Sequence, residues 1–251
     1  MLNGLQVVRM AAASGLLVVM VGCERTAPPA ARLAPITVEA SYRLLFNDAL
    51  VGNSLFMLEI DADGRYALQS FTTPAGKMQR DAAHEVLETS RGSIGADGVR
   101  PLEFEESVLQ DGELALARLT FDWARRALVV EGPGGRRNIG LLPDTQDRLS
   151  YLLDAARLAG TGDDSRLLQV ASAEAAEETL LRVRGEESLT LPAGEFGAVR
   201  VERRTPDEDT SRELWFAPDL MPLPLRALQA SDGNSVEMQL EHLNQRRNDP
   251  R

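Results

Sequence analysis

The chain has 251 residues, 43% of them hydrophobic, and carries a formal net charge of −11. This length allows one large domain or two small ones, and a unit of about 200 residues can bury a core without a disulfide or a metal to hold it. The acidic balance argues against nucleic acid as a partner, because phosphates would repel such a surface, although solubility alone also explains the charge.

The first 22 residues are typical of an export signal. Arg9 gives a weakly positive start, and the apolar run 10–21 is too short to span a bilayer comfortably as a mature helix. The run ends in Met-Val-Gly-Cys at 20–23, which resembles the bacterial lipoprotein signal, in which a small residue precedes a cysteine that receives the lipid. We therefore expect residues 1–22 to be removed and Cys23 to be the lipid attachment site. The alternative is an ordinary secretory signal with an incidental cysteine.

Cys23 also bears on location and partners. Because it is the only cysteine, no disulfide can form within one chain. Acyl chains such as palmitate at Cys23 would hold the protein on a membrane, since each buried CH₂ contributes about 0.8 kcal/mol. Glu24, rather than an aspartate, follows the cysteine, which by resemblance to known lipoprotein sorting favours the outer membrane. The prediction is a lipid-anchored, periplasmic protein of the bacterial cell envelope, in which residues 23–35, rich in Ala and Pro, form an extended tether.

Beyond Ile36 the chain changes to short apolar alternations separated by turn residues, which are typical of half-buried antiparallel strands. The Asp-Ala-Asp-Gly sequence at 61–64 predicts a tight hairpin between two of these strands. In the first half of the chain the predicted strands cover residues 42–46, 55–60, 66–71, 85–91, 101–108, 114–123, 128–131 and 136–139.

Residues 141–157 form the one segment that convincingly predicts a helix. Asp144 or Thr145 can cap its start by accepting a hydrogen bond from a free backbone N–H, and Gly160 and Gly162 can end it. The apolar positions fall at i, i+3, i+4 and i+7 and therefore share one face: Leu149, Leu152, Leu153 and Ala156. The opposite face comprises Gln146, Asp147, Ser150, Asp154 and Arg157. We expect this helix to lie as a plug between two sheet-forming halves.

Strand patterns resume after the helix, at residues 167–171, 179–184, 187–191, 196–203, 212–216, 223–230 and 235–243. Residues 173–178 can form a short helical turn, and residues 245–251 are a polar tail. The clearest alternation is the last, where Val236, Met238 and Leu240 face one way. Together the patterns predict a mainly β protein with one domain, residues 36–244, in which a large curved antiparallel sheet or partial barrel surrounds one central amphipathic helix.

Several local sequences occur in an order and spacing that resembles a known bacterial family. They are Phe-Asp-Trp at 121–123, Asp-Thr-Gln-Asp-Arg-Leu-Ser at 144–150, Gly-Glu-Glu-Ser-Leu at 185–189 with Leu-Pro-Ala-Gly at 191–194, Glu-Leu-Trp-Phe-Ala-Pro-Asp at 213–219, and Leu-Pro-Leu-Arg at 223–226. Over roughly residues 39–243 the set resembles the family called domain of unknown function 3108. The resemblance implies an exported, β-rich domain and transfers no catalytic residue. A weaker analogy, in architecture alone, is to half-barrel lipoprotein carriers.

The sequence offers few groups for catalysis or metal binding. His84 and His242 are far apart, and neither belongs to a motif that ligates zinc. Asp144 and Asp147 could act as an acid and a base in a hydrolase, but helix capping explains them better. We therefore predict no catalytic residue, no metal site and no cofactor.

Two tryptophans and two helix leucines supply the candidate binding positions. Trp123 shares a strand face with Phe121, whereas Trp215 and Phe216 point to opposite faces, so one of that pair can line a groove while the other packs the core. The candidate groove residues are Trp123, Leu149, Leu152 and Trp215. The favoured function is a non-enzymatic carrier of a lipid, a lipoprotein segment or another envelope ligand. The alternatives are a scaffold that docks an envelope protein and, less favoured, a carboxylate-based hydrolase, and the oligomeric state stays open.

Overall fold

The computed structural model describes residues 34–76, 84–205 and 211–247. The predicted signal at 1–22, the predicted lipid site Cys23 and most of the predicted tether lie outside these residues. The segment Arg32–Arg251 forms one compact unit. Within the described ranges, no helix is both long enough and apolar enough to cross a membrane.

Fifteen strands form a single sheet in the described part of the chain, and every neighbouring pair is antiparallel except β9 with β10. The strands are β1 (Ile36–Phe46), β2 (Ala49–Ile60), β3 (Arg65–Pro74), β4 (His84–Gly95), β5 (Gly98–Gln110), β6 (Glu113–Asp122), β7 (Ala127–Gly132), β8 (Gly135–Gly140), β9 (Thr145–Asp147), β10 (Ser165–Ala171), β11 (Ala176–Leu191), β12 (Gly194–Arg204), β13 (Ser211–Phe216), β14 (Arg226–Ser231) and β15 (Asn234–Arg247).

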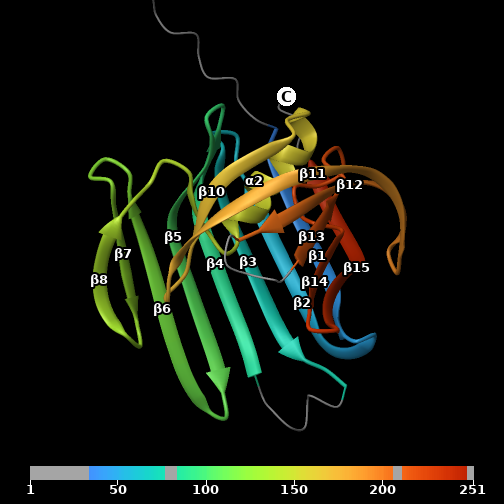
Figure 1. Cartoon of the computed structure of the whole chain (residues 1–251), viewed down its shortest axis with the longest axis horizontal. Helices are drawn as coiled ribbons and strands as arrows, with labels where there is room; N and C mark the ends of the chain where they lie inside the picture. The colour runs from blue at the N-terminus through green and yellow to red at the C-terminus, as the bar shows by residue number, and fades with distance from the viewer. Residues whose placement is uncertain (1–33, 77–83, 206–210, 248–251) are drawn as a thin grey trace, which may run out of the picture. The chain divides into compact units, whose positions relative to one another are not determined.

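The sheet is built from two meanders that join where the first and last strands pair. The first meander runs outward from β1 to β8, the chain then returns through β9 and α2 (Ser150–Thr161), and the second meander runs from β10 back to β15, which pairs with β1. Figure 1 shows the curved sheet with α2 between the strands of the first meander and strands β10 and β11. The prediction of a mainly β fold, with a large curved antiparallel sheet around one central helix, is confirmed.

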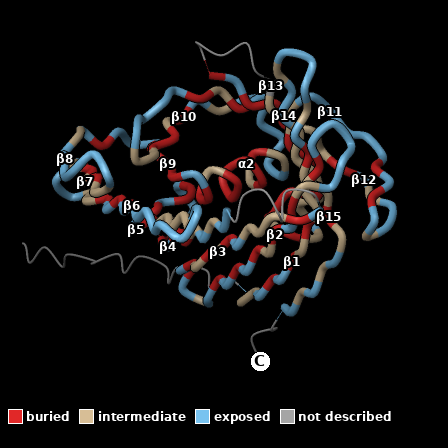
Figure 2. The backbone as a smooth tube through the Cα atoms, turned by 90° about the horizontal axis from the view of Figure 1, so that it is seen from below, coloured by how far each residue is buried: buried red, intermediate tan, exposed pale blue. Residues whose placement is uncertain are grey.

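Burial alternates along the strands because successive side chains point to opposite faces of the sheet. In β2 the alternate residues from Ser54 to Ile60 are buried, and the register places Phe56 beside Ala40 of β1 and Ser70 of β3. Figure 2 shows buried positions alternating along β1–β3 and gathered in α2. The inner face of the sheet is therefore the one that packs on the helix in the hydrophobic core.

The predicted start of the helix is wrong, because residues Thr145–Asp147 are extended and pair with β10 in parallel. The helix begins at Ser150, and Asp147 rather than Asp144 or Thr145 satisfies its first backbone donors. Asp147 Oδ1 accepts hydrogen bonds from the N–H groups of Leu149 at 2.8 Å and Ser150 at 2.7 Å, while the Asp147 N–H donates to Ser150 Oγ. The helix ends as predicted, with Gly162 in the left-handed conformation at φ 79°.

The apolar face of the helix is buried as predicted, but much of the predicted polar face is buried too. Ser150 and Asp154 are shielded from solvent, because α2 packs on β5 on one side and on β9–β12 on the others. Asp154 is paired there with Arg166, whose Nε lies 2.6 Å from Asp154 Oδ2. Gln146, which precedes the helix, is also buried and donates to the carbonyl of Val99.

Four predicted elements of the second half differ from the structure. The predicted strands 179–184 and 187–191 are one strand, β11, with a bulge between Val183 and Gly185. The predicted helical turn at 173–178 is instead a tight turn closed by the Ser172 N–H bond to the carbonyl of Ala175, after which β11 begins. The predicted strand 223–230 begins only at Arg226, because the apolar residues before it are buried in a loop.

Candidate functional site

A hollow opens on the inner face of the sheet beside the first turn of α2, with a volume of about 440 Å³. We call it the inner hollow. Its apolar wall combines the helix with strands of both meanders and comprises Phe56, Leu149, Leu152, Val170, Leu214, Ala227 and Met238. Charged residues also line it, namely Arg148, Arg203, Arg212, Glu88, Glu174 and Glu177. Its size lies within the roughly 300–1,000 Å³ range of ligand pockets in proteins.

Strand register produces the apolar wall. Leu214 of β13, Ala227 of β14 and Met238 of β15 are direct neighbours across three strands and share the inner face. Phe56 makes an edge-to-face contact with Tyr42, and the two ring centroids lie 5.3 Å apart. The Tyr42 hydroxyl in turn donates to the carbonyl of Pro224 at 2.9 Å. The wall is therefore formed by side chains that the core already holds in place.

A buried hydrogen-bond network fixes the start of the helix next to this wall. Ser90 Oγ donates to Asp147 Oδ2 at 2.7 Å, and the Tyr66 hydroxyl lies 3.0 Å from Ser90 Oγ. Burial raises the pKa of the Asp147 carboxyl, although the hydrogen bonds from Ser150, Ser90 and Leu149 act in the opposite direction. The carboxyl thus serves as a buried cap that sets the position of Leu149 at the edge of the inner hollow.

Glu88 is the buried carboxyl of the hollow itself. Burial raises its pKa above the ordinary value of 4.5, and the nearby guanidinium of Arg148 partly offsets this effect. Arg148 Nε lies 3.4 Å from Glu88 Oε1, while Arg148 Nη1 lies 2.9 Å from Glu106 Oε1. Ser70 Oγ donates to the second oxygen of Glu88 at 3.0 Å. Arg148 therefore already has two carboxyl partners.

The raised pKa of Glu88 predicts a pH-dependent contribution to stability. The folded chain retains this proton at pH values where the unfolded chain has released it, so the free energy of unfolding should fall as pH rises above about 4.5. Glu88→Gln removes the titrating group, and the variant should lose less stability than the parent between that pH and neutrality. Urea unfolding at the two pH values measures the difference. An equal or steeper decline in the variant would contradict the assignment, because the other buried carboxyls are common to both chains.

The structure places the four candidate groove residues in three different settings. Leu149 and Leu152 line the inner hollow. Trp123 stacks on Phe121 with ring centroids 6.1 Å apart, and its Nε1 donates to the carbonyl of Pro101 at 2.7 Å. Trp215 is buried, with its Nε1 donating to the Glu187 carboxylate. Neither tryptophan lines the inner hollow, and each instead donates a hydrogen bond to a residue outside it.

Phe216 is buried as well as Trp215, and neither of the two lines the inner hollow. Sequence reasoning missed Phe56, Met238 and Arg203. Arg203 lies two residues after the inward-facing Val201 on the same strand. Strand alternation could therefore have predicted from the sequence that the cationic side chain of Arg203 also faces inward.

The two aspartates considered for a hydrolase do not form a shared site. Asp147 is wholly buried in the helix cap, whereas Asp144 is half exposed and pairs with Arg166 at 3.0 Å. Among the residues with described positions, no group of three or more His, Cys, Asp or Glu side chains could hold a metal ion.

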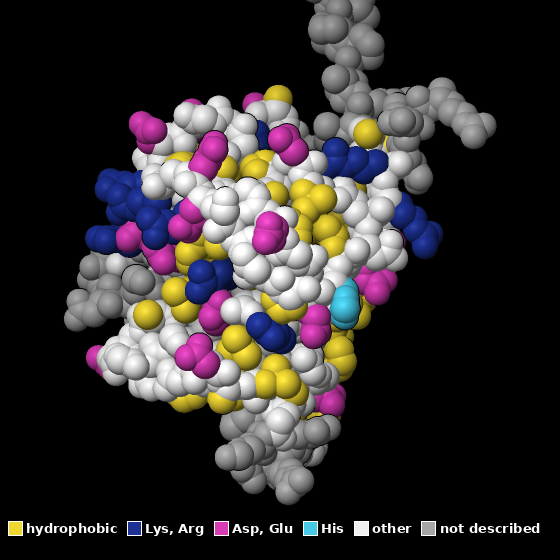
Figure 3. Space-filling view, turned by 90° about the vertical axis from the view of Figure 1, so that its right-hand side faces the viewer, with side chains coloured by type: hydrophobic (Ala, Val, Ile, Leu, Met, Phe, Trp, Pro, Cys, Tyr) yellow, Lys and Arg dark blue, Asp and Glu magenta, His cyan; other side chains and the backbone are white. Residues whose placement is uncertain are grey.

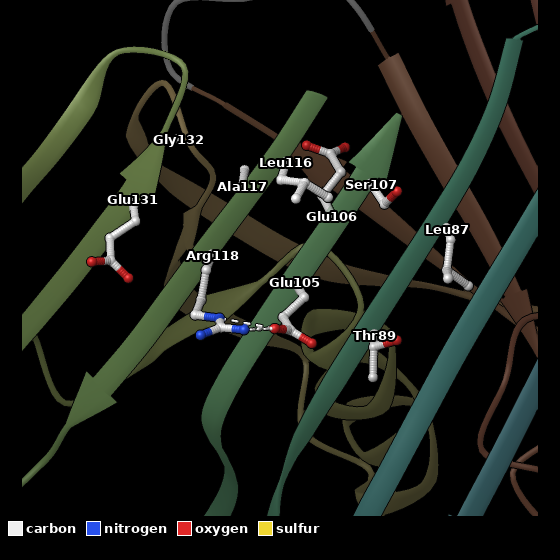
Figure 4. Close-up of a pocket in the computed structure, with 10 residues that line it drawn as sticks. All are labelled: Leu87, Thr89, Glu105, Glu106, Ser107, Leu116, Ala117, Arg118, Glu131 and Gly132. Atoms are coloured by element: carbon white, nitrogen blue, oxygen red, sulfur yellow. Dashed lines mark hydrogen bonds and ion pairs between the residues drawn. The ribbon is translucent and has the colours of Figure 1, made fainter. Parts of the chain in front are cut away.

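A second hollow, of about 380 Å³, lies on the outer face of β4, β5 and β6. We call it the outer hollow, and Figure 4 shows its residues. Register aligns Leu87, Ser107 and Leu116 in one row across the three strands, and Leu116 is 61% exposed. Arg118 and Glu105 form an ion pair beside this row.

The surface charges are mixed on at least one face of the molecule. On the face shown in Figure 3, acidic, basic and apolar side chains are interspersed over the strands.

Comparison with solved structures shows the fold. The Beta-barrel-like protein of domain of unknown function DUF1849 from Brucella abortus is 13% identical, with a TM-score of 0.56 over 86% of this chain and 100% of that chain. A candidate lipoprotein from Parabacteroides distasonis is 12% identical, with a TM-score of 0.31 over 83% of this chain and 95% of that chain. A candidate exported protein with a YmcC-like fold from Bacteroides fragilis is 12% identical, with a TM-score of 0.30 over 86% and 97%. No curated protein matches the chain.

The first of these likenesses indicates a common curved-sheet architecture, and the other two are too distant to add to it. A family model described as "Protein of unknown function (DUF3108)" matches residues 41–241, which span most of the sheet and the whole of α2. The match agrees with the resemblance carried by the local sequences, and the chain belongs to this family.

Proposed function

We propose that this protein is a binding or carrier module of the bacterial cell envelope, and that it holds an apolar ligand in the inner hollow beside α2. The observation that carries the proposal is the hollow itself, whose wall is formed by apolar side chains of the core, or packed against it, from both meanders and the helix. A concave site that combines an apolar wall with polar groups able to orient a ligand has the form of a small-molecule binding site.

The surroundings of the hollow favour binding over catalysis. Glu88 is engaged by Arg148 and Ser70, and Asp147 is engaged by backbone N–H groups and Ser90. Carboxyls held by several partners are poorly placed to exchange protons with a substrate. The lipid anchor at Cys23 and an outer-membrane, periplasmic location belong to the same proposal, and the Gly-Cys pattern at 22–23 supports them.

Filling the hollow should weaken ligand binding without unfolding the protein. Ala227 lies between Leu214 and Met238 in the wall, so Ala227→Phe directs a ring into the cavity. N-phenyl-1-naphthylamine, whose fluorescence increases in apolar surroundings, is a suitable neutral probe. We expect the parent chain to bind this probe and Ala227→Phe to bind it about tenfold more weakly, a difference of about 1.4 kcal/mol.

The matched control is Leu116→Ser in the outer hollow, which removes an exposed apolar side chain from the other face. This variant should bind the probe as the parent does. If Leu116→Ser loses the probe while Ala227→Phe retains it, the outer face is the binding surface and the proposed carrier site is wrong. A parent chain that does not bind the probe would count against the proposal in the same way.

A further inference from the structure

Arg203, which lines the inner hollow, is buried but has no acidic partner among the described residues. Arg203 is only 8% exposed, and its guanidinium lies over the ring of Tyr151 at 4.7 Å from the centroid. Its Nε has no hydrogen-bond partner, and no carboxylate in the described part of the chain pairs with it. A buried cation without a counter-charge is costly, since the charge has lost water and gained no partner.

A second arginine, Arg226, also lies over an aromatic ring, but it has an acidic partner as well. The Arg226 guanidinium lies over the ring of Trp215 at 4.6 Å, and Arg226 Nε also lies 2.6 Å from a carboxylate oxygen of Glu237. Arg226 lies outside the inner hollow, whereas Arg203 lines it. Among the described residues, a carboxylate therefore pairs with the stacked arginine outside the hollow, whereas none pairs with the stacked arginine inside it.

Another arginine, Arg212, lies beside Arg203. The register places Arg212 of β13 directly opposite Arg203 of β12, and both residues line the inner hollow. Among the described residues, the acidic members of the lining do not pair with Arg203: Glu88 lies next to Arg148 and Ser70, and Glu174 and Glu177 are exposed to solvent.

We propose that the ligand of the inner hollow is a single-chain amphiphile, whose anionic carboxylate or phosphate headgroup pairs with Arg203 and whose acyl chain lies along Phe56, Leu152, Leu214 and Met238. This inference rests on the proposed carrier function and names the chemistry of the ligand. A guanidinium fixed on an aromatic ring presents its N–H groups in a plane that suits both carboxylate and phosphate oxygens.

Binding of three sixteen-carbon compounds to the purified full-length chain tests the headgroup. Palmitate carries a carboxylate, hexadecyl phosphate carries a phosphate, and hexadecanol is neutral, while the chain length is the same. We expect the two anions to displace N-phenyl-1-naphthylamine at concentrations about tenfold to a hundredfold lower than hexadecanol, because a hydrogen bond to a charged group contributes about 1.5–3 kcal/mol. Whichever anion binds more tightly identifies the headgroup class.

Arg203→Met keeps the length of the side chain and removes its charge. It should lose the preference for the anions while hexadecanol binds as before, whereas Arg203→Lys should keep part of the preference. Arg226→Met is the matched control, since it removes a stacked arginine outside the hollow and should leave all three affinities unchanged. The unfolding midpoint of each variant confirms that it is folded.

The outcomes separate this inference from the carrier function on which it rests. If the parent chain binds all three compounds equally and Arg203→Met changes none of them, the carrier function stands and the anionic headgroup is wrong. If the parent chain binds none of the three compounds, both the carrier function and the headgroup assignment fail. A loss of anion preference in Arg226→Met but not in Arg203→Met would place the headgroup elsewhere and overturn the inference.

Discussion

Asp147→Ala is expected to lower the free energy of unfolding by about 3 kcal/mol, because it leaves several buried donors without an acceptor. The side chain accepts from the N–H groups of Leu149 and Ser150 and from the hydroxyl of Ser90, all in the interior. Loss of an ordinary N-cap costs about 1 kcal/mol, and the unpaired Ser90 hydroxyl and the cavity left by the carboxyl add to it. Urea unfolding at neutral pH measures the loss.

Asp144→Ala is the matched control for this prediction. Asp144 is one of the two residues that the sequence pattern places at the helix start, yet its side chain is half exposed and pairs only with Arg166 in the described structure. Its replacement should cost less than about 1 kcal/mol, as is usual for an exposed ion pair. If the two variants were equally destabilised, or if Asp144→Ala were the worse, the assignment of Asp147 as the cap would be wrong.

The consequences of the cap extend to the proposed binding site. Leu149 and Tyr151 lie within four residues after Asp147, and Tyr151 provides the ring on which Arg203 lies. A helix start that frays moves both residues at the edge of the inner hollow. The same short segment therefore links the stability of the fold to the shape of the site.

The sequence predicted the architecture well because strand and helix periodicities are local properties of the chain. The i, i+3, i+4, i+7 spacing identified the buried face of α2, and period-2 alternation identified most strands. The helix start was missed for a non-local reason. Residues Thr145–Asp147 pair with Gln169–Ala171, and nothing within the helix segment itself indicates that these residues will be held as a strand.

The binding site was harder to predict than the fold, since it depends on which residues become neighbours across strands. Alternation shows that Leu214 and Met238 face inward, but only the register places them on either side of Ala227. Elsewhere in the sheet, bulges at Glu241 of β15 and Arg184 of β11 shift the register with β1 and β12 by one residue, and such shifts leave little trace in a single sequence. Trp123 and Trp215, which the sequence suggested as groove residues, instead donate hydrogen bonds to the Pro101 carbonyl and the Glu187 carboxylate.

Leu153→Ala is expected to lower the free energy of unfolding by about 3 kcal/mol, because Leu153 is fully buried where α2 packs in the core. Removing its branched end deletes apolar contacts and leaves a closed cavity that the surrounding strands cannot fill. Leu152 is its neighbour on the same helix but lines the inner hollow. Leu152→Ala should therefore cost less, about 2 kcal/mol, since the space it vacates joins a hollow that already exists.

Comparing the three leucine variants Leu153→Ala, Leu152→Ala and Leu142→Ala by urea unfolding tests the inner hollow without any ligand. Leu142 is half exposed and precedes the helix, so its truncation should cost less than about 1 kcal/mol. The expected order of destabilisation is Leu153 first, then Leu152, then Leu142. A Leu152→Ala variant as unstable as Leu153→Ala would mean that Leu152 is enclosed by tight packing, and the space beside the helix would then be too well filled to receive an acyl chain.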